Sequence, residues 1–321
     1  MEAGTDGGAG EPAPLREFLG FVARRRAFLA GYAIVVAVLA MGLAAPWIAP
    51  HSPVNADASA YLVPPSLAHP MGTDTAGLDV FSRVLYAPRV DLLIALLSTA
   101  LAALIGGALG CAVAIWEGRG GLRDAGAALV SRTADVAQAF PVFALALVLV
   151  AVLGQGVLSI VLAIGIVNVP VFLRVMRTQV LAIRTQPFVE SARVSGAGDL
   201  YLLRHHLVPN ALAAVLAQMA INIGSAVLLA AGLSFIGAGV RAPTPEWGSM
   251  IAMGFQNVIT GQWWPSLFPG LALALTVLGF GLVGASIEAW SDPRERTRPS
   301  RAAWRAFIAA CGSGRRSVAG A

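Results

Sequence analysis

The chain alternates between long apolar runs and short polar connections, and the length of the apolar runs gives the first prediction. The hydrocarbon core of a bilayer is about 30 Å thick, and a helix that rises about 1.5 Å per residue needs roughly 20 apolar residues to cross it. Six segments meet or approach this length. They are Phe28–Ile48, Leu92–Ile115, Val136–Leu153, Val157–Leu173, Ala211–Phe235 and Ser266–Ile287. The pattern predicts an all-α membrane protein with six transmembrane helices.

The third and fourth runs are short and carry Pro141, Asn168 and Pro170. Proline is tolerated in a spanning helix where neighbouring helices satisfy the freed carbonyl, so two separate spans are expected. The alternative is that the two runs form one re-entrant hairpin. The first run follows a basic segment, but it is too long for a cleavable signal peptide and lacks a clear small-x-small exit. A retained first helix is therefore expected.

Composition agrees with the membrane prediction and charge adds an orientation. Hydrophobic residues make up 57% and charged residues 12%, against roughly 45–50% and about 25% in soluble domains. All 22 basic residues are arginine. With both ends on one side, all but Arg83, Arg89 and Arg241 fall on that side, which the positive-inside rule makes cytoplasmic. Topology and anionic lipid thus account for the net charge of +5, and no nucleic-acid partner is implied.

Tryptophans fall at the ends of the predicted spans, where interfacial anchoring is expected. They are Trp47, Trp116, Trp263, Trp264 and Trp290. Cys111 lies in an apolar run and Cys311 in the tail, and both are expected to be unpaired.

A polar segment between the fourth and fifth apolar runs has a distinctive internal order. Small residues around Ala192 are followed by a glycine bend at Gly196, and Asp199 is a plausible N-cap for a short helix over Leu200–His206. Leu200, Leu203 and Leu207 recur at i, i+3 and i+7, which predicts one apolar strip on this helix. Such a strip suits helix-in-groove recognition by a partner.

This segment resembles the cytoplasmic EAA loop of ABC importer permeases, and residues 178–210 are called the EAA-like loop below. Glu190, Ala192, Gly196 and Pro209 stand in register with that pattern, whereas Ser191 and Val208 depart from it. In the family this loop is where the permease meets its ATPase. The resemblance implies the following ATPase-coupling residues: Glu190, Ala192, Gly196, Asp199, Leu200, Leu203, Arg204, Leu207 and Pro209.

Two further motifs narrow the resemblance. The first, residues 69–83, reads His-Pro-Met-Gly-Thr-Asp-Thr-Ala-Gly-Leu-Asp-Val-Phe-Ser-Arg. The second is residues 233–248, and residues 267–270 fit the same pattern. These resemble the C-type permease subunit of dipeptide, oligopeptide and nickel importers, although Leu78 stands where that signature has Arg. Gly72 and Gly77 permit a tight turn, and Asp79 is expected to cap the helix that follows. Asp292-Pro293-Arg294 also fits, so the resemblance covers roughly residues 20–296.

The resemblance implies a type I ABC importer-like permease of the bacterial inner membrane. It would pair with a second permease subunit, bind one or two ATPase subunits and receive solute from an extracytoplasmic binding protein. The expected organisation is a cytoplasmic tail (1–27), the first helix with an extracytoplasmic connection (28–90), a five-helix core (91–290) and a second cytoplasmic tail (291–321). The motifs do not distinguish dipeptide, oligopeptide, glutathione-like and nickel systems.

No enzymatic activity or bound cofactor is expected of this chain. A Walker A loop needs a lysine that reaches the phosphates, and the chain has none. No histidine lies in a predicted span, which argues against an intramembrane protease. A secondary transporter is the remaining alternative, but it would usually carry ionisable residues deep in its spans. Here Asp91, Asp135 and Glu288 lie near span edges.

Polar residues of the fifth span are candidates for the translocation path. Gln218, Asn222 and Ser225 recur at i, i+4 and i+7 and so share a helix face. Polar groups at membrane depth usually face the bundle interior or an aqueous cavity, although hydrogen bonding between helices is an equal alternative. Gln138 and Asn168 are weaker candidates of the same kind.

The four histidines are expected to be ordinary polar residues rather than metal ligands. His205 and His206 are adjacent, so they point about 100° apart on a helix. His51 and His69 lie in the extracytoplasmic connection and are expected to be loop residues. No metal site is predicted.

Overall fold

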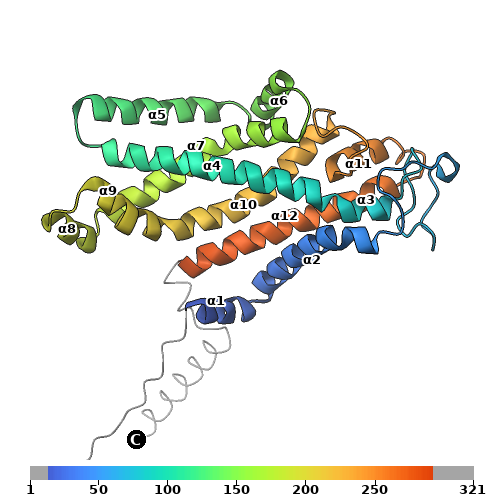
Figure 1. Cartoon of the computed structure of the whole chain (residues 1–321), viewed down its shortest axis with the longest axis horizontal. Coiled ribbons are helices and arrows are strands. Elements are labelled where there is room, and N and C mark those ends of the chain that lie inside the picture. The colour runs from blue at the N-terminus through green and yellow to red at the C-terminus, as the bar shows by residue number, and fades with distance from the viewer. Residues whose placement is uncertain (1–13, 292–321) are drawn as a thin grey trace, which may run out of the picture.

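The structure, a computed structural model, describes residues 14–291, and the elongated bundle they form contains helices and no strand (Figure 1). The expectations for Cys311, the tail arginines and Asp292-Pro293-Arg294 lie outside the described residues. Asp79 is confirmed as the cap of the helix that follows it, because its Oδ2 accepts a hydrogen bond from Ser82 N at 2.8 Å.

Five helices are long and apolar enough to cross a membrane, as expected for five of the six predicted runs. They are α2 (Arg26–Ile48), α4 (Pro88–Trp116), α7 (Val157–Arg184), α10 (Val208–Phe235) and α12 (Trp264–Ser291). Their outer surfaces carry many exposed large apolar side chains, such as Leu43, Leu104 and Leu278. Exposed apolar area of this extent is explained by contact with lipid.

Shorter elements occupy the two ends of the bundle and its side. They are α1 (Pro14–Ala23), η1 (Ala58–Ala60), α3 (Val80–Tyr86), α5 (Gly121–Ala139), α6 (Val142–Leu153), α8 (Pro187–Val194), α9 (Asp199–Leu202), the π turn η2 (Leu203–Leu207) and α11 (Trp247–Phe255). The helices α8 and α9 lie at one end, and α3 and α11 lie at the opposite end with the 49–90 connection (Figure 1).

The third predicted span, Val136–Leu153, is not one straight helix. The helices α5 and α6 meet at 95°, because Pro141 keeps the preceding Phe140 in an extended conformation. With 12 residues, α6 is roughly 18 Å long and cannot cross a bilayer alone. The bent pair is a broken span or a re-entrant segment. The alternative in which the third and fourth runs form one re-entrant hairpin is wrong for the fourth run. The helix α7 continues for 28 residues with Pro170 in its interior.

Close approach of α4 and α7 organises the centre of the bundle. A Cβ on Gly106 would lie 2.4 Å from the Val169 carbonyl oxygen, and a Cβ on Gly110 would lie 2.5 Å from that of Leu173. The two glycines are four residues apart and face α7 together, which is the small-xxx-small pattern of membrane helix interfaces. Glycine is required here because the α7 backbone occupies the space of a side chain.

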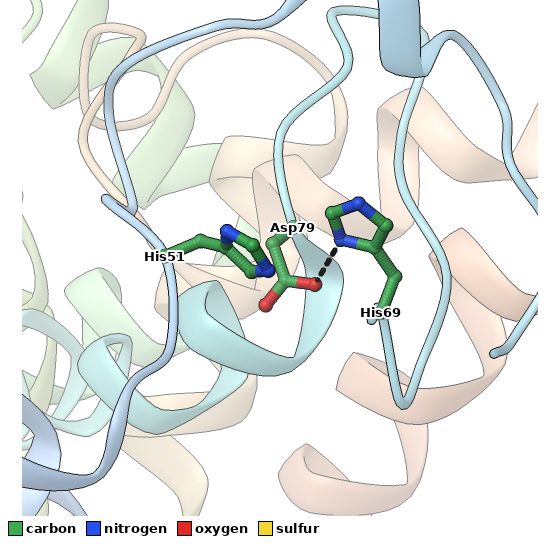
Figure 2. A group of neighbouring side chains, drawn as sticks. All are labelled: His51, His69 and Asp79. Carbon is green, nitrogen blue, oxygen red and sulfur yellow. Dashed lines mark hydrogen bonds and ion pairs between the residues drawn. The ribbon is translucent and has the colours of Figure 1, made fainter. Parts of the chain in front are cut away.

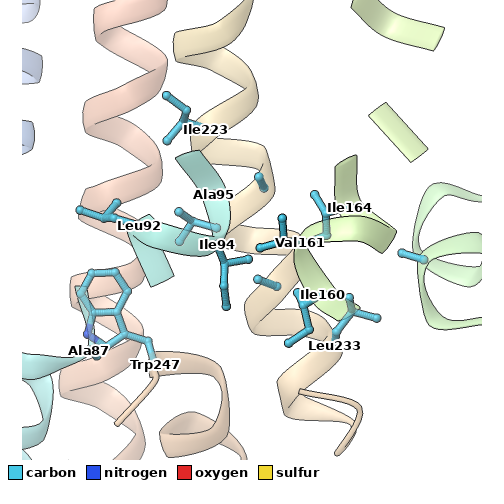
Figure 3. Packing of buried hydrophobic residues seen from close by; sticks show 14 of the residues in the cluster. Ala87, Leu92, Ile94, Ala95, Ile160, Val161, Ile164, Ile223, Leu233 and Trp247 are labelled. Carbon is cyan, nitrogen blue, oxygen red and sulfur yellow. The ribbon is translucent and has the colours of Figure 1, made fainter. Parts of the chain in front are cut away.

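A second buried region lies toward the end that carries α3 and α11 (Figure 3). Ile94 of α4, Ile160 and Ile164 of α7 and Leu233 of α10 are fully buried there, together with Trp247 at the start of α11. This packing joins α11 to three spanning helices. Trp264 is buried rather than interfacial, because its Nε1 donates to the Thr73 carbonyl oxygen at 3.1 Å under the 49–90 connection.

Candidate functional site: the EAA-like loop

The EAA-like loop begins within the last turns of α7, which end at Arg184, and then folds as two short helices, α8 and α9, joined by a glycine turn. Pro187 occupies the first turn of α8, where its missing N–H is not needed. Gly196 has φ +90°, a conformation that L side chains rarely adopt. Its N–H bonds the Arg193 carbonyl, and the next N–H, of Ala197, bonds that of Ala192. The glycine in the family register is therefore required by the backbone itself.

Three apolar side chains anchor the loop in the bundle. Val189 of α8, Leu202 of α9 and Leu207 of η2 are at most 3% exposed. They pack in one cluster with side chains of α4, α7 and α10, namely Ala102, Cys111, Ala114, Phe172, Met176, Val180, Ala211 and Val215. The helix from Asp199 runs without a break into α10 and ends at Phe235. The loop is thus fixed to three spanning helices.

The predicted apolar strip on this helix is wrong in part. Leu203 and Leu207 face the buried cluster, joined by Leu202, whereas Leu200 is 77% exposed. The cause is the π turn at Leu203–Leu207, which changes the helical winding just before Pro209. Proline has no N–H to donate and its ring crowds the preceding turn, so a widened turn accommodates it. Leu207 is consequently an anchor and is not available to a partner.

Asp199 is not the predicted N-cap. Gly198 holds the capping position, and Asp199 is the first helical residue. Its Oδ1 accepts a hydrogen bond from Arg119 Nη2, which follows the end of α4. The side chain is therefore used in a contact between segments instead of a cap.

Two further arginines connect α7 to the end of α4. Arg177 makes a bidentate pair with Glu117, at 3.0 and 2.8 Å. Arg184 Nη1 donates to the carbonyl oxygens of Ala114 at 2.8 Å and Glu117 at 3.3 Å, which satisfies groups that a helix C-terminus leaves free. The sequence indicated only that these arginines lie on one side of the membrane. Their partners are 60 to 80 residues distant, so no local pattern identifies them.

The outer surface of the loop combines aromatic, apolar and charged side chains. The rings of Phe188, Tyr201, His205 and His206 lie 4.3 to 6.1 Å from one another in successive contacts. Phe188 is 46% and Tyr201 53% exposed. Exposed beside them are Leu200, Val194, Glu190, Arg193 and Arg204, while Ala192 is half-buried against the anchoring cluster. Exposed aromatic residues with arginine are typical of protein interfaces.

The polar residues of the fifth span do not share one environment. Asn222 is buried and links three helices: its Oδ1 accepts from Thr99 of α4 at 3.0 Å, and its Nδ2 donates to Asn168 of α7 at 2.9 Å. Ser225 is exposed and bonds the Ile221 carbonyl of its own helix. Gln138 accepts a hydrogen bond from Arg174. For Asn222 and Asn168 the geometry matches the alternative of hydrogen bonding between helices.

Gln218 lines a hollow of about 600 Å³ between α7, α10 and α12. The polar lining also includes Gln179, Asn210 and Glu288, and small residues such as Ala214 and Ala217 leave the space open. This hollow lies toward the end of the bundle that carries the EAA-like loop, since Asn210 and Ser291 border it.

A helical bundle with lipid-facing surfaces, a buried polar link and a rigid helical loop at one end defines a multi-span permease. The chain belongs to the family described as binding-protein-dependent transport system inner membrane component, whose model matches residues 106–297. It is 40% identical over 261 residues to the probable D,D-dipeptide transport system permease protein DdpC of Escherichia coli K12, covering 81% of this chain and 85% of that protein.

Two other relatives are similar over a longer span. The di/tripeptide transport system permease protein DppC of Pseudomonas aeruginosa UCBPP-PA14 is 35% identical, and the dipeptide transport system permease protein DppC of Escherichia coli K12 is 37% identical. Each comparison covers 88% of this chain and 93% of the relative. The chain is thus an ABC transport permease, a membrane component rather than an enzyme, and the secondary-transporter alternative is not supported.

Proposed function

We propose that this chain is one of two permease subunits in an ATP-driven importer of short peptides. The relatives are named as permeases of D,D-dipeptide, di/tripeptide and dipeptide transport systems, which supports peptides over the other solutes left open by the motifs. The solute is delivered by an extracytoplasmic binding protein, and a separate chain hydrolyses ATP. The surface of the EAA-like loop supports this assignment most directly.

The EAA-like loop is the binding site for the ATPase. Its inner face is anchored by Val189, Leu202 and Leu207, and its outer face presents Phe188 and Tyr201. An ATPase that binds the outer face therefore contacts a loop that cannot move independently of the bundle. Arg119, Arg177 and Arg184 extend the same attachment to α4 and α7. Movement of the ATPases on nucleotide binding is transmitted to α4, α7 and α10 together.

Both termini and the EAA-like loop lie in the cytoplasm. Of the arginines in the described residues, Arg83, Arg89 and Arg241 belong to the end with α3 and α11, and the others belong to the loop end or to the α5 segment. The positive-inside rule then places the 49–90 connection and α11 outside, where a binding protein docks.

The translocation path runs along the face of α10 that carries Gln218. The hollow there has polar side chains that contact a peptide backbone without requiring a particular side chain. Asn222, one turn further along α10, links α4 and α7 beside this path and maintains their spacing.

Co-purification and transport test this assignment. The full chain is co-expressed with its neighbouring transport genes, purified in mild detergent and analysed by mass spectrometry. Wild type retains an ATPase and a second permease. Leu200→Asp loses only the ATPase, because binding would bury the new carboxylate in the interface without a partner for its charge. Leu67→Asp changes a leucine that is even more exposed, at the opposite end, and it retains the ATPase.

Proteoliposome transport distinguishes the remaining possibilities. Peptide uptake that requires ATP and the binding protein supports the assignment. A chain that purifies alone and moves solute without ATP contradicts it, as does retention of the ATPase by Leu200→Asp at wild-type levels.

A further inference from the structure

Three potential metal ligands converge at the end of the bundle that carries α3 and α11 (Figure 2). His51 follows the end of α2, His69 lies in the 49–90 connection, and Asp79 caps α3. One ligand atom from each residue lies within 4.8 Å of the others. No local pattern in the sequence brings these residues together, since His51 and His69 are separated by 18 positions and a folded loop.

The side-chain atoms lie near the spacing of ligands on one ion, with His69 and Asp79 joined by a hydrogen bond. His69 Nδ1 lies 2.9 Å from Asp79 Oδ1. Ligands of a tetrahedral Zn²⁺ centre, bound at about 2.0–2.1 Å, lie roughly 3.3 Å apart. The imidazole rings of His51 and His69 are stacked with centroids 4.6 Å apart and planes at 27°.

The main chain beneath these side chains is held in place. Ser82 accepts a hydrogen bond from His51 N with its Oγ at 3.2 Å and donates its own N–H to Asp79 Oδ2 at 2.8 Å. Ser66 Oγ accepts from His69 N at 3.1 Å, and the His69 carbonyl accepts from Gly72 N. A site whose ligands are positioned before the ion arrives loses little conformational entropy on binding.

The three side chains differ in their exposure to solvent. Asp79 is 2% exposed, the His69 side chain is 18% exposed and His51 is exposed. His51 therefore marks the open side of the cluster, and Asp79 marks its buried side. Two histidines, one carboxylate and an open position form a donor set that zinc and similar borderline cations accept.

We propose that His51, His69 and Asp79 form a binding site for a divalent transition-metal cation of the zinc class. The bound ion joins the end of α2 to the 49–90 connection and to the start of α3, and so stiffens the extracytoplasmic surface. The site is independent of the peptide-import function, and its test does not use transport.

Zinc binding to the full chain in lipid nanodiscs, purified without a polyhistidine tag, tests the site. Isothermal titration with ZnCl₂ gives one equivalent per chain at micromolar or tighter affinity. His51→Ala is the main variant, because this exposed side chain contributes little to the core. It weakens binding at least tenfold, as loss of a ligand or its supporting partner typically does. His69→Ala has the same effect.

Two further variants separate metal binding from folding and from unrelated histidines. Asp79→Asn keeps an oxygen that can cap α3 but removes the charge, and it weakens binding while the wild-type melting temperature without zinc is nearly retained. The double variant His205→Ala, His206→Ala at the opposite end binds zinc as wild type does. Zinc raises the melting temperature of wild type and of that control but not of His51→Ala.

Cobalt supplies a spectroscopic readout. Co²⁺ in a site with nitrogen and carboxylate ligands gives visible absorption bands whose intensity reports low coordination number, and these are absent in His51→Ala. Zinc affinity unchanged by His51→Ala, or no binding at micromolar zinc, overturns the proposal and leaves the three residues as a hydrogen-bonded cap.

Discussion

Arg119 Nη2 donates a hydrogen bond to Asp199 Oδ1 across 2.5 Å, joining the segment after α4 to the first residue of the helix that continues as α10. The two side chains are 31% and 39% exposed. Exposed ion pairs contribute about 0–1 kcal/mol to stability. The contact therefore matters because it links the end of α4 to the EAA-like loop rather than because of its energy.

Loss of this pair is expected to uncouple transport from ATP hydrolysis. Arg119→Ala in the reconstituted transporter changes the melting temperature by no more than a few degrees but lowers the peptide transported per ATP several-fold. The exchanged double variant, Arg119→Asp with Asp199→Arg, restores part of the ratio. Arg174→Ala, which removes the more exposed pair with Asp135, serves as the control. An unchanged ratio in Arg119→Ala would show that the contact is incidental.

Neighbouring glycines of α4 should respond differently to substitution. Gly106→Ala puts a Cβ within 2.4 Å of the α7 backbone and is expected to destabilise the bundle by about 1–3 kcal/mol. Gly107→Ala meets only the flexible end of Met176 at 3.7 Å, and alanine favours the helix by up to about 1 kcal/mol. Thermal unfolding in detergent compares the two variants. Equal melting temperatures would contradict the close α4–α7 contact.

The turn of the EAA-like loop offers a second matched pair. Gly196 has φ +90° and space around it, so Gly196→Ala costs about 1–2 kcal/mol through the backbone alone. Gly198 has φ −72° and also has space, so Gly198→Ala is tolerated. ATPase retention during purification is the readout: it falls for Gly196→Ala and not for Gly198→Ala. Similar retention in both would mean that the turn is not needed for docking.

Asn222 and Gln218 are predicted to affect different properties. Asn222→Leu leaves the Thr99 hydroxyl and the Asn168 side-chain Oδ1 without their partner, and should cost about 0.5–2 kcal/mol. Gln218→Ala enlarges the hollow, leaves the melting temperature nearly unchanged and alters the affinity for transported peptides. Measurement of both properties for each variant checks this division. A Gln218→Ala transporter with wild-type peptide kinetics would remove Gln218 from the path.

Glu246 is expected to make stability depend on pH. Burial raises the pKa of this carboxyl above its ordinary value of 4.5, although hydrogen bonds from Ser249 N and Gly248 N oppose the shift. A raised pKa means that the folded state binds the proton more tightly than the unfolded state. The stability that this proton contributes is therefore present below pH 4.5 and is lost as pH rises through the folded pKa.

Glu246→Gln tests this sign. The melting temperature of the variant falls less than that of wild type as pH rises above 4.5, because the glutamine side chain has no carboxyl proton to lose. Glu190→Gln, an exposed acid of the EAA-like loop, keeps the wild-type profile. The prediction would be contradicted if the melting temperatures of wild type and Glu246→Gln changed equally with pH above 4.5.

Several features were readable from the sequence because their causes are local. The length of an apolar run is set by bilayer thickness, so α2, α4, α10 and α12 begin and end within a few residues of the predicted bounds. The cap by Asp79 depends on residues three positions apart. The register of Glu190, Ala192, Gly196 and Pro209 indicated the family, which the relatives confirm.

Other features depended on contacts between distant segments. The break between α5 and α6 required Pro141 to act as a terminator, although Pro46, Pro170 and Pro269 lie inside continuous helices. The difference is whether neighbouring helices satisfy the freed carbonyl, which no single segment reveals. Asp199 was expected to cap a helix from its local sequence alone. Its actual partner, Arg119, is 80 residues away, so the local sequence does not indicate the contact.

The sequence by itself determined the membrane class, the family and the lengths of α2, α4, α10 and α12, since bilayer thickness and local backbone geometry act on neighbouring residues. Only the tertiary structure decided which faces of those helices are buried, which arginines join α4 to α7 and α9, and that His51, His69 and Asp79 meet. The physical reason is that hydrogen bonds and packing act over a few ångströms in space, and chain folding alone brings distant positions within that range.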